Sequence, residues 1–145
     1  MRALTVVAGL CFGLCMASLA PAADEMGRRT RKIHGPIPTN GASLEQARRA
    51  ILLGMYHNKG VKLTYEGETA NSVFARWDYR GGAVVFEVRY DDKQIQVLYR
   101  DASHELACKE LKAGICHDGT NRYYNYMPNF TKSIRNQLAY ILRAA

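Results

Sequence analysis

The hydrophobic pattern of this 145-residue chain changes its period twice, and this change limits the fold more than any other feature. Apolar residues recur at helical spacing over residues 44–58, alternate with polar residues in four runs over 61–100, and return to helical spacing over 123–141. A period of two is typical of half-buried strands, and a 3.6-residue period is typical of amphipathic helices. The sequence therefore predicts an α+β fold, in which a four-stranded antiparallel β-meander is covered on one face by an N-terminal and a C-terminal helix.

Local signals place the ends of both helices. Ser43 and Gln46 have the spacing of a capping box, so we expect the first helix to run from about residue 44 to 58. Pro128 lacks an amide hydrogen and therefore either begins the last helix or kinks a longer one that starts near Asn121. The apolar stripe of this helix consists of Tyr123, Met127, Phe130, Ile134, Leu138 and Ile141.

Two tight turns predict which residues of the meander face the helices. A two-residue loop at Gly81–Gly82 would pair Trp77 with Phe86, and a turn at Asp91–Asp92 would pair Phe86 with Val97. Both hairpins place the same residues on the apolar face, so the two predictions support each other.

The N-terminal segment predicts export. Arg2 is followed by an apolar run that ends in small residues at 20–23, which is the pattern of a secretory signal peptide cleaved near Ala22. An uncleaved anchor is the alternative, because the run is about long enough to span a bilayer. Lipidation at Cys11 or Cys15 is disfavoured, because leucine precedes each. We expect a periplasmic protein with no membrane span after cleavage.

The chain divides into a signal peptide (1–22), a flexible basic arm (23–42) and a single α+β domain (43–145). The arm has two prolines and very few apolar residues, which predicts disorder. Its basic residues are Arg28, Arg29, Arg31 and Lys32. Cleavage would leave 19 basic and 13 acidic residues, a balance that favours an anionic membrane surface or cell-wall polymer as partner, although solubility alone also accounts for it. We expect no nucleic-acid partner, because most aromatic residues fall on the helix-facing side of the sheet.

Two cysteines remain after cleavage. In an oxidising compartment, Cys108 and Cys116 are expected to form a disulfide. The alternative is a metal or small-ligand site in which His104 and His117 join the two cysteines, but this spacing matches no standard zinc site.

The sequence contains no motif that predicts catalysis or a cofactor. Ser103, His104 and Glu105 are adjacent, but neighbouring residues of a strand point to opposite faces and no glycine elbow frames the serine. Gly81 and Gly82 join two strands and do not form a phosphate-binding loop before a helix. We therefore expect a non-enzymatic protein without a cofactor.

The outer face of the predicted sheet is a candidate partner surface. It combines apolar and basic side chains, and Arg89 would lie opposite Phe74 and could stack on its ring. The six residues are Phe74, Arg76, Val85, Arg89, Leu98 and Arg100. The alternative interpretation is an ordinary solvated face with scattered apolar residues.

Several motifs carry a family resemblance. They are Tyr90-Asp91, the strand over residues 96–103, and a helix start with Tyr123, Tyr126-Met127, Asn129-Phe130 and Ile134. Over residues 44–142 the chain resembles a family of small, uncharacterised proteobacterial envelope proteins, many described as lipoproteins. It departs from them in lacking a lipidatable cysteine and in carrying the Cys108–Cys116 insert. The resemblance implies the fold and the compartment and no catalytic residue. We therefore expect an exported protein that acts through contacts with proteins or with the envelope surface.

Overall fold

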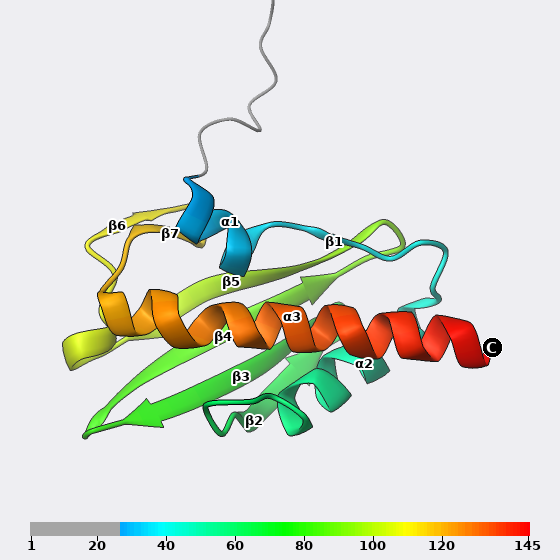
Figure 1. Cartoon of the computed structure of the whole chain (residues 1–145), viewed down its shortest axis with the longest axis horizontal. Coiled ribbons are helices and arrows are strands. Elements are labelled where there is room, and N and C mark those ends of the chain that lie inside the picture. Colours follow the sequence, from blue (N-terminus) through cyan, green and yellow to red (C-terminus); the bar gives the residue numbers. More distant parts are fainter. Residues whose placement is uncertain (1–26) are drawn as a thin grey trace, which may run out of the picture.

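A five-stranded antiparallel sheet forms one layer, and helices lie across one of its faces in the computed structural model (Figure 1). The structure describes residues 27–145, so the expected signal peptide (1–22) lies outside the described residues. The strand order is β1-β5-β4-β3-β2. The strands are β1 (Ile37–Pro38), β2 (Thr64–Thr69), β3 (Ser72–Tyr79), β4 (Gly82–Tyr90) and β5 (Gln94–Ala102). The helices are α1 (Arg28–His34), α2 (Leu44–Tyr56) and α3 (Asn121–Ala144).

The α+β class and the antiparallel sheet are confirmed, but the strand count of four is wrong. The fifth strand is β1, in which Ile37 pairs with Ile95 of β5. A separate two-stranded hairpin, β6 (Glu110–Lys112) and β7 (Ile115–Asp118), lies between β5 and α3 in the sequence. No helix in residues 27–145 has both the length and the apolar character that a membrane span requires.

The predicted start of the first helix is correct, and the structure decides between the two starts left open for the last one. The Ser43 hydroxyl accepts from the Gln46 amide at 3.2 Å, and the Gln46 side chain accepts from the Ser43 amide at 2.9 Å, which completes the capping box of α2. Thr120 caps α3 by accepting from the Tyr123 amide. Pro128 lies inside α3, so the longer of the two predicted helices is the one formed.

The predicted sheet faces are correct, whereas the predicted registers are each shifted by two residues. Trp77 lies opposite Val84, because the first turn is formed by Arg80 and Gly81, both with positive φ (47° and 78°). In the second hairpin Phe86 lies opposite Tyr99 and not Val97. A shift of two positions leaves every side chain on its original face, so the alternating pattern cannot distinguish the two registers.

The core lies between the sheet and α2 and α3. All six residues of the apolar side predicted for the last helix are buried, and Phe86 of β4 packs against two of them, Tyr123 and Phe130. Helices α2 and α3 approach closely at Gly54, where a Cβ atom would lie 2.8 Å from Cγ1 of Ile134. The absence of a side chain at Gly54 is therefore what allows the two helices to meet.

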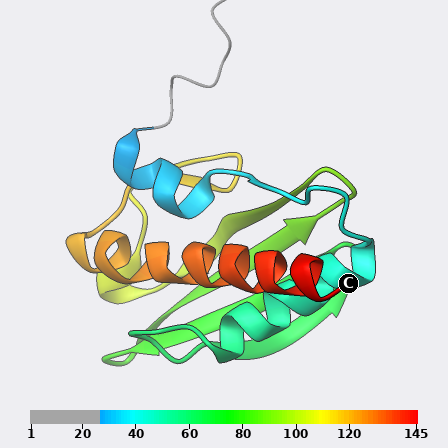
Figure 2. The ribbon, with the colours of Figure 1, turned by 45° about the vertical axis from the view of Figure 1, so that its right-hand side comes forward.

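The expectation of a flexible arm is wrong for residues 28–42. This segment forms α1 and β1, and α1 lies beside α3 in both views (Figures 1 and 2). Thr30, Ile33 and His34 are buried at helical spacing, whereas the four basic residues of α1 are exposed. Few apolar residues suffice here, because α3 and β5 supply the rest of the buried surface.

Candidate functional site

The positive charge of the described chain is concentrated on two helices. α1 and α3 together contain eight lysines and arginines and no aspartate or glutamate. The rest of residues 27–145 contains eleven basic and eleven acidic residues and is therefore balanced. The eight are Arg28, Arg29, Arg31, Lys32, Arg122, Lys132, Arg135 and Arg143. The two helices lie side by side (Figure 2), and five of the eight cations line one groove between them.

A groove of about 890 Å³ runs between α1 and α3, and we call it the basic groove. Five of its eight lining residues are cationic and none is acidic. They are Arg28, Arg31, Lys32, Pro128, Asn129, Lys132, Arg135 and Asn136. A concave surface that presents charge of one sign focuses the electrostatic field on an anionic ligand.

A second hollow, of about 400 Å³, lies on the other side of the same ridge of α3. Asn129, Lys132 and Asn136 line both hollows, and His57 and Lys59 from the loop after α2 complete the second one. The polar, basic surface therefore extends across α3 from α1 to the end of α2.

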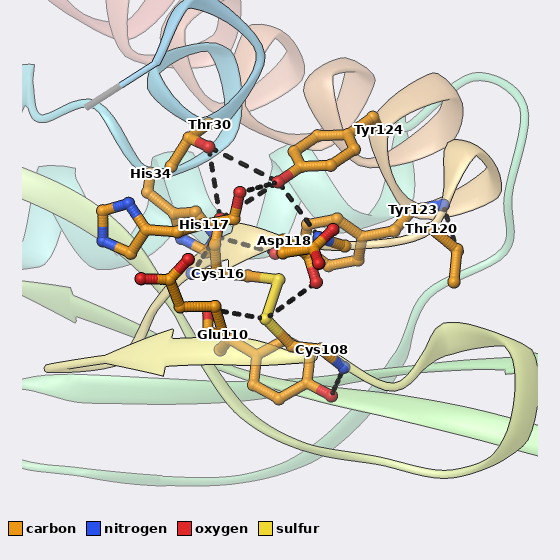
Figure 3. Close-up of a disulfide and its surroundings, with 12 residues drawn as sticks. Thr30, His34, Cys108, Glu110, Cys116, His117, Asp118, Thr120, Tyr123 and Tyr124 are labelled. Atoms are coloured by element: carbon orange, nitrogen blue, oxygen red, sulfur yellow. Dashed lines mark hydrogen bonds between the residues drawn. A yellow bond between two sulfur atoms is a disulfide. The ribbon is translucent and has the colours of Figure 1, made fainter. Parts of the chain in front are cut away.

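The position of α1 depends on the buried imidazole of His34 (Figure 3). Its Nδ1 lies 2.7 Å from the carbonyl oxygen of Val97, which can only accept, so Nδ1 carries the hydrogen. Nε2 then accepts from the hydroxyl of Tyr123 at 2.7 Å and from the amide of Cys116 at 3.2 Å. Burial lowers the pKa of His34 from 6.5 to about 4, since desolvation outweighs the hydrogen bond to Val97. The ring is therefore neutral near pH 7.

Two threonine hydroxyls reinforce this attachment. Thr30 in α1 donates to the carbonyl of Cys116 at 3.2 Å, and Thr131 in α3 donates to the carbonyl of Ile33 at 2.7 Å. The Ile33 side chain is fully buried. These contacts fix the basic residues of α1 relative to those of α3, so the groove is a preformed feature of the fold.

The predicted disulfide between Cys108 and Cys116 is confirmed, with the two Cα atoms 5.8 Å apart. Cys116 is buried, and both its amide and its carbonyl bind α1, so the disulfide stabilises the same region as His34 (Figure 3). With the sulfur atoms bonded to each other, neither is free to bind a metal together with His104 or His117. Within residues 27–145, no group of three or more potential metal ligands is present.

The candidate surface on the outer sheet face has its positive charge largely compensated. The Arg76 guanidinium lies 2.8 Å from the Asp78 carboxylate. Arg89 and Arg100 both pair with Glu87, at 3.1 and 3.5 Å. Each arginine predicted for this surface therefore has an acidic partner, in contrast to the basic groove.

The apolar residues of this face are also less accessible than expected. Leu98 is only 6% exposed, because the turn at Gly114 packs on it, and Phe74 and Val85 are half-buried. Arg89 lies opposite Ser72 and not Phe74, so the predicted cross-strand stacking pair is wrong. The six residues share a face, but they do not form an open apolar and cationic patch.

The Ser103-His104-Glu105 segment has structural partners. The Ser103 hydroxyl accepts from the amide of Ala83 at 3.1 Å, and Glu105 lies 3.8 Å from Arg122. These contacts connect the segment to β4 and to α3.

Sequence reasoning missed the contribution of α3 to the site. It took the basic cluster to be residues 28–32 alone, although Lys132 and Arg135 of α3 are also exposed. The complete absence of acidic residues over 121–144 was the available signal. Comparison of the chain with protein-family models, curated proteins and solved structures finds no match.

Proposed function

We propose that the protein is an exported, non-enzymatic component of the cell envelope that binds an anionic surface or polymer through the basic groove. The observation that carries the proposal is the charge distribution: all of the net positive charge of residues 27–145 comes from α1 and α3. Dispersed charge would serve solubility equally well. Five of these eight cations line one groove, and this concentration is better explained by a ligand.

The chemistry of the groove suits anions. Lys32, Lys132 and Arg135 have no carboxylate within ion-pairing distance among residues 27–145, so their charge is available to a ligand. Arginine binds carboxylate and phosphate groups through two parallel hydrogen bonds, and lysine acts as a point charge. The lining therefore supplies both the hydrogen-bond donors and the positive charge that an anion-binding site requires.

The envelope location is part of the proposal. It is supported by the signal-like sequence of residues 1–22. It is also supported by the Cys108–Cys116 disulfide, because such bonds persist in the periplasm and are rare in the cytosol of mesophiles.

Cosedimentation with purified cell-wall sacculi and with anionic lipid vesicles tests the proposal. Lys132→Ala combined with Arg135→Ala should greatly reduce binding at low salt, and added salt should reduce binding by the unsubstituted protein. Lys93→Ala combined with Lys109→Ala is the matched control, since it removes the same charge from exposed positions elsewhere. Equal losses for the two double variants, or no binding to either material, would contradict the proposal.

A further inference from the structure

A line of polar residues runs along the solvent face of α3, and we call it the α3 stripe. Its members follow one another at spacings of three or four, which places them along one side of the helix, and all are exposed. They are Asn125, Asn129, Lys132, Asn136, Tyr140 and Arg143. At 1.5 Å per residue the stripe is about 27 Å long, which exceeds the length of a single sugar or phosphate ligand.

Three asparagines of this line stand at positions where the helix itself does not favour them. Asparagine is a poor helix former, because its amide competes for backbone hydrogen bonds, and alanine would suit each exposed position better. The side chains of Asn125, Asn129 and Asn136 make no hydrogen bond to any residue in 27–145. Residues that disagree with their local structure without a structural gain are expected at functional sites.

We infer that the ligand of the basic groove is a linear acidic polysaccharide that lies along the α3 stripe. This inference rests on the proposed function and names the class of its ligand. An asparagine amide offers a donor and an acceptor side by side, which matches the hydroxyl groups of a sugar. Lys132 and Arg135 match acidic groups that recur along such a chain.

Tyr140 supplies the third element of this recognition. Its side chain is 62% exposed, and it lies one helical turn beyond Asn136. A tyrosine presents a flat apolar ring and a hydroxyl, so it can cover the face of a sugar ring and bond to its substituents.

The surface is less suited to the other polyanions of a cell. A membrane site would place apolar side chains at its rim. A site for single-stranded nucleic acid would present several aromatic rings on which successive bases stack. The α3 stripe meets neither requirement, because Tyr140 is its single exposed large apolar residue. The other exposed large apolar residues among 27–145 lie outside α3, and they are Leu44, Tyr56, Tyr65 and Leu111.

The test compares two polyanions that both carry carboxylates, one built of sugar rings and the other a polypeptide without sugars. The protein, produced by export so that its disulfide forms, is titrated with polygalacturonate and with polyglutamate at low salt, and neutral dextran serves as the uncharged control. We expect tighter binding to polygalacturonate than to polyglutamate. Asn129→Ala combined with Asn136→Ala should weaken polygalacturonate binding about fivefold or more and leave polyglutamate binding unchanged. Tyr140→Ala should act in the same way.

Unfolding does not explain such losses, because alanine at exposed helix positions should maintain or raise the melting temperature. If both asparagine positions and Tyr140 can be replaced without effect on polygalacturonate, the inference is wrong, while the proposed function survives as a general anion site. Tighter binding to anionic vesicles or to DNA than to polygalacturonate would also overturn it. If the Lys132→Ala, Arg135→Ala protein binds every polyanion normally, both the inference and the proposed function fail.

Discussion

The buried imidazole of His34 predicts that the fold loses stability in mild acid. In the folded protein the ring keeps its neutral form down to about pH 4, because burial lowers its pKa from 6.5. In the unfolded chain the ring takes up a proton near pH 6.5. Between these values the unfolded state binds more protons than the folded state, so the free energy of unfolding falls as the pH falls.

The size of this effect follows from the difference between the two pKa values. At pH 5 the unfolded imidazole is almost fully protonated and the folded one is almost fully neutral. A pH of 5 lies about 1.5 pH units below the pKa of the unfolded imidazole. Proton linkage then lowers the free energy of unfolding by about 2 kcal/mol relative to pH 7. At pH 4 the loss reaches about 3 kcal/mol, and carboxylates begin to contribute there as well. Between pH 7 and pH 5 the change in the free energy of unfolding therefore comes mainly from His34.

Urea unfolding followed by the fluorescence of Trp77, the single tryptophan of the chain, measures this loss directly. Trp77 is buried in the folded protein, so its emission reports unfolding. His34→Gln keeps a donor and an acceptor at this position but removes the titrating group. Its stability should be lower at pH 7 and should change little between pH 7 and pH 5. His57→Gln, on the surface near the end of α2, should keep the dependence of the unsubstituted protein.

A free energy of unfolding that stays constant from pH 7 to pH 5 in the unsubstituted protein would refute this reasoning. A loss of the expected size that persists in His34→Gln would assign the effect to other groups. Either result would mean that His34 does not hold α1 in place as a neutral ring.

Three further predictions concern the packing around α1 and α3. Reduction of the disulfide, or replacement of Cys108 and Cys116 by alanine, should cost about 2–3 kcal/mol because the bond closes a short loop, and urea midpoints with and without reductant measure this. Gly54→Ala should cost about 1–2 kcal/mol, seen as a lower melting temperature, because its Cβ would lie 2.8 Å from Ile134. Ile33→Ala should cost about 2–4 kcal/mol and make α1 sensitive to trypsin, whereas an unchanged digestion pattern would indicate that the segment is not anchored by this side chain.

The sequence predicted the elements that depend on local signals. The capping box at Ser43 and the buried stripe of α3 each involve residues within one helix, and both are correct. The hairpin registers are wrong by two residues, because alternation specifies a face and not a position along the strand. The observed turn at Arg80 and Gly81 is displaced by one residue from the predicted Gly81–Gly82 turn. The sequence favours the predicted turn, because arginine rarely adopts the positive φ that Arg80 has.

The ordered state of α1 could not be predicted from its own composition. Its partners lie far away in the sequence: His34 contacts Tyr123, and Ile33 accepts a hydrogen bond from Thr131. A segment with few apolar residues gains order when a distant helix supplies the complementary surface. For the same reason, sequence reasoning identified only the α1 wall of the basic groove and took that segment to be a flexible arm.

The contacts that hold α1 also determine one wall of the basic groove, and this connects stability to binding. Arg28 and Lys32 line the groove only while α1 is packed against α3. That packing uses the amide and the carbonyl of Cys116, whose position the disulfide fixes. Reduction under conditions in which α3 stays folded should therefore weaken polyanion binding, and Lys132→Ala combined with Arg135→Ala should weaken it further. Binding that is unchanged after reduction, with circular dichroism showing α3 intact, would mean that α3 alone forms the site.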